Sequence, residues 1–529
     1  MKRIHIIGAG LAGLSAAITL SEGGIPCSLI SLQPSERAQS VLAEGGINGA
    51  LDTMGEGDTP AQHFEDTMRG GVYLADPNAV DNLTRHAPEI LRWLESLGVP
   101  FNRTSEDIAL RPFGGQKKRR TAYARSSTGK ILMTAVIDEA RKFEARGLIH
   151  RYPRHEFLRL LTDAGTCRGV RIRDCYTGEI CDLTGAVILC SGGMNGIFPG
   201  MTTGTTQNSG DVAAVCLAQG VAFGNLEMLQ YHPTTIGIPG KRCLVTEAAR
   251  GEGGRLYIER GGEKWYFMEE KYPELGNLMP RDVVAREMYF VRRQADTGDQ
   301  VYLDMTALPE ETWRNKLSDL RQELMHYLAL DPKAAPIPVQ EGIHYFMGGI
   351  LTDEEHRTNL RDLYAAGECT CQYHGANRLG GNSMLGALYG GRRAAQTVLQ
   401  GEIPDAAESP FTGEEPLSTP AAPALIRQIS EILLGAMGIV RKEAALKQAL
   451  SRLDALHAEY LRGEYRILLA RAMLLSALER RESRGAHYRE DFPEKDEALR
   501  KPIAAAVQDG TISLEFRPLP ERRSHAGNT

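Results

Sequence analysis

The chain has 529 residues, more than one hydrophobic core normally organises, so we expect about two to four packing units. Hydrophobic residues make up 42% and charged residues 24% of the sequence, which is typical of water-soluble enzymes and excludes a disordered or membrane-spanning chain. The formal net charge of -6 provides no basic field for a phosphate backbone, so we expect no nucleic-acid partner. An anionic ligand would need a local basic pocket.

The nine cysteines are scattered in an odd number without the spacing of a disulfide framework. Cys369 and Cys371 lack a second pair of Cys or His at metal-binding spacing, so we expect free thiols and no metal site. No apolar leader precedes the first strand at Ile4, and the apolar stretches 429–440 and 467–478 are well below the ~20 residues of a membrane span. We therefore expect a cytoplasmic protein that reaches a membrane only through other subunits.

The N-terminal region predicts a strand, a turn, a helix and a second strand. Ile4 to Ile7 has the pattern of a buried strand, Leu11 to Leu20 that of a helix with small residues toward a sheet, and Cys27 to Ser31 that of the next strand. This βαβ order is typical of dinucleotide-binding domains. Two more apolar strands that end in glycine, at 186–189 and 363–366, lie far away in the chain. We therefore expect one Rossmann-like domain assembled from residues 1–226 and 337–400.

The remaining segments differ in character. Residues 227–336 mix helix and loop and end in a proline cluster, which favours an inserted α+β capping domain. Five prolines among polar residues indicate an exposed linker at 401–423. Apolar residues at helical spacing then predict three packed helices in a C-terminal domain at 424–500, and the tail at 501–529 alternates like a short strand after Gly510. The expected fold class is α/β, with a Rossmann-like domain, an inserted capping domain and a C-terminal helical bundle.

Three glycines of a dinucleotide fingerprint, Gly8, Gly10 and Gly13, lie between the first strand and the first helix. They permit a tight turn and let a pyrophosphate approach the helix N-terminus. The second strand ends at Ser31 without the acidic residue that usually binds the ribose of NAD, which favours FAD. A later strand leads to Glu368 in a segment that resembles the second motif of FAD oxidoreductases, where an acid binds the ribityl hydroxyls. Alone, Glu368 would be read as a solvated residue at a strand end.

Cationic and hydrogen-bonding side chains recur in four stretches, at 230–234, 246–254, 344–349 and 374–383. A four-carbon dicarboxylate needs such groups at both ends and a dry flavin face between them. Taken singly, each His or Arg is as readily a structural histidine, a surface ion pair or a helix cap. Their ordered occurrence after a flavin fingerprint favours a site for a small dianion.

From the first strand to residues 482–493, the chain closely resembles the flavoprotein subunits of succinate dehydrogenase and fumarate reductase, with their relative L-aspartate oxidase. The resemblance implies that the substrate carboxylates are held by His232, Thr246, His344 and Arg378, beside an apolar wall formed by Phe113. It also implies that protons are transferred by Arg281 and relayed by Glu247 and Arg250.

For the cofactor, the resemblance implies a loop beneath the flavin ring formed by Glu44, Gly45 and Gly46. Further contacts are implied from Asp211, Ser383 and Met384. Together with the glycine fingerprint, the predicted FAD site is completed by Ser31, Ser40, Gly193 and Glu368.

One position departs from most membrane-bound members of this family. They carry a histidine before the Ala-Glu-Gly-Gly sequence that bonds covalently to the flavin, and this chain has Gln39 at the matching place. No histidine lies between His5 and His63. We therefore predict non-covalent FAD. Because a covalent link raises the flavin potential in this family, its absence is a hypothesis in favour of fumarate reduction.

The resemblance implies an oxidoreductase that interconverts fumarate and succinate by hydride transfer at flavin N5, with an arginine as proton donor. The alternatives are L-aspartate oxidase and a reductase of another enoate. L-aspartate oxidase has a glutamate within the segment that reads Phe113-Gly114-Gly115-Gln116 here, which favours the unaminated dicarboxylate. The sequence has no haem or iron-sulfur cluster motif, so electrons must be exchanged with an external partner, either an iron-sulfur subunit or a diffusible reductant.

Overall fold

The structure, a computed structural model, describes residues 3–125, 127–296, 298–402, 423–459 and 464–523. A five-stranded sheet in the order β19-β10-β1-β2-β6 joins distant parts of the chain. All its neighbouring pairs are parallel, as βαβ crossovers require. The predicted Rossmann-like sheet is thus confirmed. Its strands are β1 (Ile4–Ile7), β2 (Cys27–Ser31), β6 (Ile149–Pro153), β10 (Val187–Leu189) and β19 (Leu363–Ala365).

Alternate side chains of each strand point to opposite faces of this sheet, so the strands contribute to two separate cores. Ile6, Leu29 and Ile188 belong to the core shared with the helices α1 (Leu11–Glu22), α4 (Thr128–Ala145) and α11 (Asn382–Gln400). Ile7 and Leu189 belong to the core on the other side, which includes an antiparallel meander. Its strands are β7 (His155–Asp163), β8 (Thr166–Asp174) and β9 (Ile180–Thr184).

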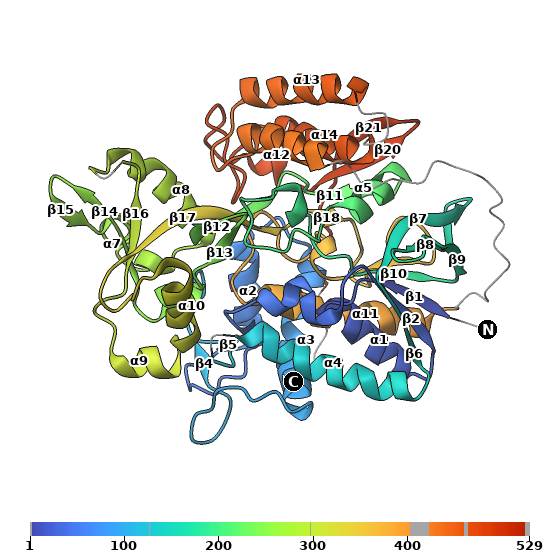
Figure 1. The fold of residues 1–529 in the computed structure, drawn as a ribbon, viewed down its shortest axis with the longest axis horizontal. Coiled ribbons are helices and arrows are strands. Elements are labelled where there is room, and N and C mark those ends of the chain that lie inside the picture. Colours follow the sequence, from blue (N-terminus) through green and yellow to red (C-terminus); the bar gives the residue numbers. More distant parts are fainter. Residues whose placement is uncertain (1–2, 126, 297, 403–422, 460–463, 524–529) are drawn as a thin grey trace.

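A second large sheet extends away from the first and carries the inserted region (Figure 1). It is antiparallel in the order β13-β12-β17-β16-β14-β15. Its long strands β12 (Leu229–Ile238) and β17 (Ile337–Phe346) pair with each other, so the inserted region leaves and rejoins the chain at one place. The other elements are β13 (Lys241–Leu244), α6 (Glu247–Gly251), β14 (Arg255–Arg260), β15 (Glu263–Trp265), α7 (Phe267–Lys271), α8 (Arg281–Val291), β16 (Val301–Asp304), α9 (Glu310–Asn315) and α10 (Ser318–Leu328).

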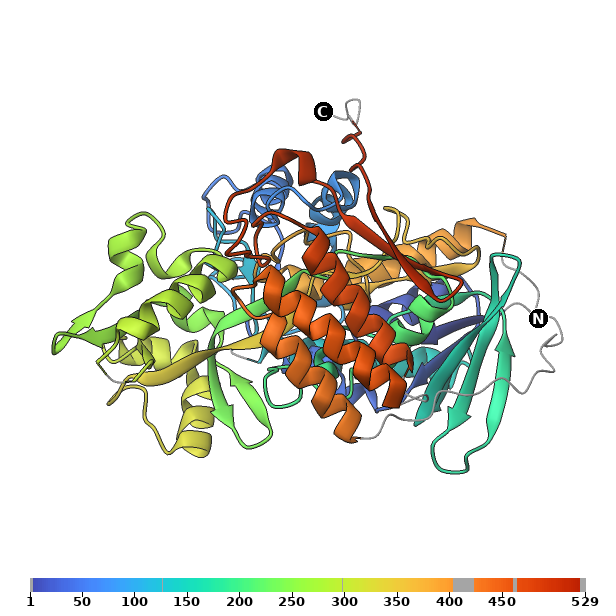
Figure 2. The ribbon, with the colours of Figure 1, turned by 90° about the horizontal axis from the view of Figure 1, so that it is seen from above.

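Three helices form the C-terminal bundle, α12 (Pro423–Ala436), α13 (Glu443–Glu459) and α14 (Glu464–Glu479). Figure 2 shows them lying across the molecule beside the base of the inserted region. The tail contains a hairpin, β20 (Ile503–Gln508) and β21 (Thr511–Phe516), rather than a strand after Gly510 alone. This hairpin joins β11 (Phe223–Gly224) and β18 (Gly349–Ile350) in a four-stranded sheet. The predicted linker lies almost wholly outside the described residues, and the domain boundaries stay predictions.

The remaining elements are short or flank the first sheet. Two helices, α2 (Pro60–Gly70) and α3 (Pro77–Ser96), are joined by a short turn. No helix among the described residues is long and apolar enough to cross a membrane. The remaining bounds are α5 (Asp211–Ala218), β3 (Ile47–Asn48), β4 (Leu110–Arg111), β5 (Thr121–Ala122), and 3-10 turns at Ser35–Arg37, Gln39–Leu42, Asn195–Ile197, Gly276–Leu278, Arg292–Gln294, Gly367–Cys369 and Glu497–Leu499.

Candidate active site

One cavity runs from the glycine turn after β1 to the inner ends of β12 and β17. Its first part lies at the carboxyl ends of β1, β2 and β10, where parallel α/β sheets bind their ligands. The predicted cofactor residues that line it are Gly8, Gly10, Ser31, Ser40, Glu44, Gly45, Gly46, Asp211, Glu368, Ser383 and Met384. The predicted substrate and catalytic residues that line it are Phe113, His232, Thr246, Glu247, Arg281, His344 and Arg378. Gly13, Gly193 and Arg250 are not part of this lining.

The turn between β1 and α1 brings the backbone close to the cavity. Gly8 has φ of +113°, and a Cβ there would lie 2.1 Å from the Cys190 carbonyl oxygen, so only glycine fits. A Cβ at Gly13 would lie 1.9 Å from the Gly8 carbonyl oxygen, so Gly13 allows α1 to pack on the turn rather than contacting a ligand. The N-cap residue Gly10 has no side chain to cap the helix, so the first turn directs backbone amides toward the cavity, and the first of these, that of Leu11, donates to Ser40.

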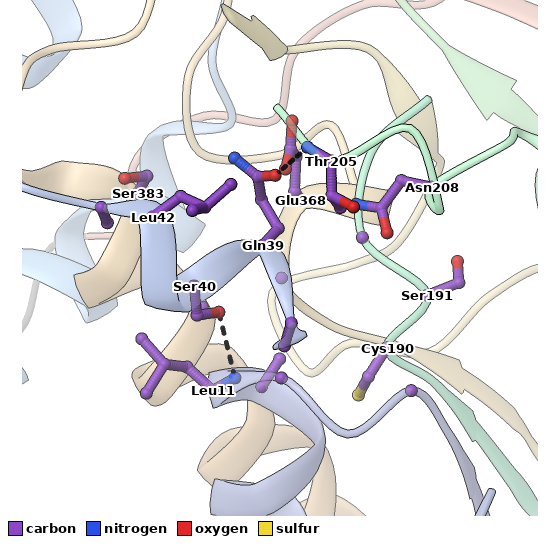
Figure 3. Close-up of a pocket in the computed structure, with 18 of the residues that line it drawn as sticks. Leu11, Gln39, Ser40, Leu42, Cys190, Ser191, Thr205, Asn208, Glu368 and Ser383 are labelled. Carbon is purple, nitrogen blue, oxygen red and sulfur yellow. Dashed lines mark hydrogen bonds between the residues drawn. The ribbon is translucent and has the colours of Figure 1, made fainter. Parts of the chain in front are cut away.

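Figure 3 shows the loop that faces this turn. The Ser40 hydroxyl oxygen accepts a hydrogen bond from the Leu11 amide at 3.3 Å. The Gln39 side-chain oxygen accepts one from the Thr205 amide at 2.5 Å. Gln39 is therefore held by the protein backbone at the edge of the cavity.

Two carboxylates lie on other walls of the cavity. Glu368 follows β19 and accepts a hydrogen bond from the Phe346 amide at 3.2 Å, and burial raises its pKa from 4.5 to about 7. Gly193 makes room for it, since a Cβ there would lie 2.4 Å from Glu368 Oε1. Asp211 forms an ion pair with Arg466 of α14. A glycine turn, a helix N-terminus and carboxylate acceptors fit the phosphates and hydroxyls of FAD.

At the far end of the cavity, His232 and His344 lie side by side with ring centroids 5.1 Å apart. His344 Nδ1 is 2.7 Å from the Thr203 hydroxyl, and His232 Nδ1 is 3.2 Å from the Thr234 amide. These bonds fix the rings by one nitrogen each. His232 Nε2 and Arg378 Nε are buried without a hydrogen-bond partner in the described part of the chain. Buried polar atoms of this kind can form hydrogen bonds to a bound ligand.

The electrostatics of this end favour an anion. Burial lowers the pKa of both histidines well below the usual value, and the nearby charge of Arg281 lowers it further. Both rings are therefore neutral at pH 7. Burial also lowers the pKa of Arg378 to about 9, with Arg281 contributing. A bound carboxylate would relieve this crowding of positive charge.

Arg281, at the first position of α8, is held by a buried carboxylate. Its Nε and one terminal nitrogen donate to Glu247 Oε2 at 3.0 and 2.5 Å. Arg250 lies behind and donates to Glu247 Oε1 at 3.3 Å and to the Asn277 carbonyl at 2.6 Å. Burial would raise the pKa of Glu247, but the two arginines outweigh it and the pKa is lowered. The array keeps Glu247 ionised between two guanidinium groups.

Thr246 and Phe113 complete this end of the cavity. Thr246 is the N-cap of α6, and its hydroxyl oxygen accepts from the Ala248 amide at 3.4 Å. Phe113 is buried, and a Cβ on Gly45 would lie 2.5 Å from its ring. The aromatic wall thus reaches the loop that also carries Glu44.

Two residues with a clear structural part in the site had no predicted role. Gln230 accepts from Arg281 at 3.1 Å and donates to the Asn377 side chain and the Arg378 carbonyl, each at 2.9 Å. Tyr345 lies beneath the Arg378 guanidinium, 4.4 Å from ring centroid to Cζ. Gln230 precedes His232 by two positions on a strand, which places both on one face and was the available signal. Tyr345 gave no such signal.

Comparison with known proteins adds to this geometry. Residues 4–384 match the family model described as FAD binding domain, and residues 458–524 match the one described as Fumarate reductase flavoprotein C-term. The chain is an FAD-dependent oxidoreductase.

Its relatives define the family more closely. The succinate dehydrogenase flavoprotein subunit of Bacillus subtilis is 36% identical, with 95% of this chain and 94% of that protein covered. The L-aspartate oxidase of Pyrococcus furiosus is 34% identical over 96% and 99% of the two chains. A solved quinol fumarate reductase chain of E. coli matches with a TM-score of 0.87 and 29% identity over 99% of both chains. The chain belongs to the family of succinate dehydrogenase and fumarate reductase flavoprotein subunits, with L-aspartate oxidase among its relatives.

Proposed function

We propose that this protein interconverts fumarate and succinate with non-covalently bound FAD. One observation carries the proposal: two imidazoles and two guanidinium groups from distant parts of the sequence, on His232, His344, Arg281 and Arg378, line the same end of a cavity whose other end is the glycine turn. Cationic and hydrogen-bonding side chains in this number can bind both ends of a molecule that has a carboxylate at each end.

Each group has a distinct task in this proposal. His232, His344, Thr246 and Arg378 bind the carboxylates and hold the substrate carbons toward the flavin part of the cavity, while Phe113 excludes water. When bound, FAD supplies hydride transfer at N5. In the reducing direction, Arg281 donates a proton to the neighbouring carbon of the substrate.

Arg281 then recovers a proton through Glu247, which is already hydrogen-bonded to it. The second carboxylate oxygen of Glu247 contacts Arg250, which continues the path away from the cavity. Fixed donors around the substrate meet the negative charge that grows on its carboxylate in the transition state.

Steady-state assays with fumarate and an artificial donor, and with succinate and an artificial acceptor, test the activity. Arg281→Lys keeps the charge but loses the paired bonds to Glu247, so we expect turnover to fall at least 100-fold, as for loss of a positioned acid. Arg286→Lys, on the same helix, is the matched control and should stay within about twofold of wild type. Turnover of neither fumarate nor succinate by the wild-type protein would reject the proposal.

Non-covalent attachment rests on Gln39, whose side chain has no nucleophilic nitrogen for a flavin bond. Acid precipitation of the holoprotein should leave the flavin in the supernatant. A yellow pellet would contradict this part of the proposal without affecting the reaction.

L-aspartate oxidation is the second candidate, favoured by relatives of that name at 32% to 34% identity. A substrate ammonium group would need a carboxylate at the substrate end of the cavity that is not already paired, and Glu247 there is held between Arg281 and Arg250. Gln116 is uncharged and buried, and its amide nitrogen donates to the Gly380 carbonyl at 2.8 Å and to Asn48 Oδ1 at 3.3 Å. Peroxide production that depends on aspartate would identify L-aspartate oxidation. Fumarate turnover without such peroxide production would exclude L-aspartate oxidation. Turnover of another enoate in preference to fumarate would favour the remaining alternative.

We also propose that the electrons pass to an external partner in the cytoplasm, most simply an iron-sulfur subunit, and that any membrane attachment belongs to other subunits. Relatives described as flavoprotein subunits support this assignment. Affinity purification under native conditions should recover a cysteine-rich partner. Full activity of the isolated chain with free reduced flavin would instead favour a diffusible reductant.

A further inference from the structure

The loop that carries Arg378, residues 374–381, is held from outside by the C-terminal part of the chain. The Ala486 amide donates to the Ala376 carbonyl at 2.9 Å, and the Ala376 amide donates to the Gly71 carbonyl at 2.9 Å. Ala376 is thus fixed on both sides, two residues before Arg378. One anchor follows α14, and the other is the turn between α2 and α3.

The first anchor leaves no room for a side chain at Gly485. This glycine has φ of +57°, and a Cβ there would lie 2.5 Å from the Ala376 carbonyl oxygen and 2.8 Å from the Ala376 Cβ. The contact is with backbone, which cannot swing aside as a flexible side chain would. Any side chain at this position would displace the loop or the segment that carries it.

The second anchor is a strained turn that the same C-terminal segment stabilises. Val72 and Tyr73 have φ of +52° and +54°, a region that is unfavourable for a β-branched or bulky residue. Arg484 donates to the Val72 carbonyl at 3.1 Å. Arg484 is itself held by Glu482, with bonds of 2.8 and 2.9 Å. A buried ion pair therefore fixes the turn on which Ala376 rests.

The remaining contacts connect Ala376 to the substrate arginine. The Asn377 side-chain nitrogen Nδ2 donates to the Gly70 carbonyl at 3.3 Å. Ala376 packs in one small apolar cluster with Tyr345, whose ring supports the Arg378 guanidinium, and Val72 and Ala486 pack against this cluster. Displacement of Ala376 would therefore change both the backbone and the aromatic support of Arg378.

We propose that Arg484, Gly485 and Ala486 form a positioning element for Arg378, through which the C-terminal region sets the affinity of the active site for a substrate carboxylate. The inference rests on the proposed dicarboxylate function. It adds a part for residues that lie outside the cavity and contact neither the substrate nor the cofactor. Their effect should appear in substrate binding more than in cofactor binding.

Gly485→Ala is the direct test, with Gly510→Ala as the matched control. Gly510 lies in the turn between β20 and β21 and also has positive φ, +73°, but a Cβ there would meet nothing within 4 Å. Both variants carry the backbone strain of alanine in this region, and only one collides with the Arg378 loop. The holoprotein is titrated with malonate by flavin absorbance, and fumarate KM, kcat and bound FAD are measured.

We expect Gly485→Ala to raise the malonate Kd and the fumarate KM at least tenfold, with FAD content retained and kcat reduced less than KM is raised. Gly510→Ala should match wild type within about twofold. Equal malonate affinities in the two variants would overturn the proposal. Wild-type holoprotein that neither binds malonate nor reduces fumarate would reject the proposed function and, with it, this inference.

If Gly485→Ala fails to fold, Arg484→Lys decides. Lysine keeps the charge beside Glu482 but cannot bridge it to the Val72 carbonyl with the same fork of donors. A rise of at least threefold in malonate Kd at unchanged FAD content would support the positioning element. An unchanged Kd in folded Arg484→Lys would contradict it.

Discussion

Replacement of Gln230 by leucine should expose how strongly the two substrate-side arginines depend on one amide. Gln230 is fully buried and makes three hydrogen bonds, one to the charged Arg281 and two to the loop of Arg378. A bond to a charged group contributes about 1.5 to 3 kcal/mol and a neutral one about 1 kcal/mol. The carbonyl of Arg378 would also be left buried without this donor. We therefore expect the free energy of unfolding to fall by about 3 to 5 kcal/mol.

Urea denaturation of the apoprotein measures this loss, and fumarate reduction measures its effect on the site. Because Arg281 would lose one of three bonds that orient it, kcat/KM should fall at least tenfold. Gln340→Leu is the control: Gln340 also bonds an arginine, Arg242 at 2.8 Å, but it is exposed and should cost less than about 0.5 kcal/mol. A Gln230→Leu protein within 1 kcal/mol of wild type, with normal activity, would refute the reasoning.

Three further predictions concern the walls of the cavity. Burial raises the pKa of Glu368 from 4.5 to about 7, so this carboxyl group should cost the folded apoprotein about 3 kcal/mol of stability as the pH rises through this range. Urea unfolding at pH 5 and pH 8 should therefore show a smaller loss of stability in Glu368→Gln than in wild type, and equal losses would contradict the raised pKa. Phe113→Ala should lower the free energy of unfolding by about 3 to 5 kcal/mol and raise the fumarate KM, whereas Phe113→Leu should cost less stability. Equal stabilities of these two variants would contradict the conclusion that the Phe113 ring is a buried wall of the cavity. Arg466→Ala should change the free energy of unfolding by less than about 1 kcal/mol, because its partner Asp211 is 31% exposed. A larger loss of stability in thermal unfolding would contradict this weak contribution of the ion pair.

The sequence predicts correctly those helices and strands whose formation depends on short-range sterics and on the periodicity of apolar residues. The strands Ile4–Ile7 and Cys27–Ser31 were predicted with the bounds that the structure has, and the first helix ends only two residues later than expected. The three C-terminal helices follow from the 3.6-residue spacing of their apolar residues. These signals are contained within each segment, so no distant contact was needed to interpret them.

The first strand of the C-terminal hairpin could not be predicted from local sequence patterns. Its first strand, Ile503–Gln508, contains three consecutive alanines and lacks polar alternation. It is a strand because it pairs with Phe223–Gly224 and with β21, and the first of these partners lies far away in the sequence. No pattern within residues 501–529 reports that pairing.

The candidate site divides in the same way. The family motifs marked the residues whose side chains line the cavity, but they also marked Gly13, Gly193 and Arg250, which support others from behind. A motif records that a residue type is required without telling whether it contacts a ligand or makes space for one that does. Conversely, Gly485 gains its importance only from the position of Ala376, which sequence spacing does not reveal.

The positive charges at the substrate end favour a dicarboxylate over an amino acid. Three buried guanidinium groups, those of Arg250, Arg281 and Arg378, surround the single carboxylate of Glu247, and the lowered pKa values leave both histidines neutral. These six side chains therefore carry a net charge of +2 at pH 7, which Glu368, with a pKa of about 7, offsets only in part. A dicarboxylate brings two negative charges and balances it, whereas aspartate, with its ammonium group, brings only one.

In a buried site the unbalanced charge should cost more than the roughly 1.4 kcal/mol that corresponds to a tenfold change in affinity. Malonate or succinate should therefore bind the oxidised holoprotein at least ten times more tightly than L-aspartate at pH 7, measured by the change in flavin absorbance under anaerobic conditions. Raising the pH toward the pKa of the amino group should narrow the difference, because aspartate then becomes a dianion. Equal affinities for the dicarboxylate and L-aspartate at pH 7 would show that a carboxylate not counted in this balance faces the substrate. That result would favour aspartate oxidation over fumarate reduction.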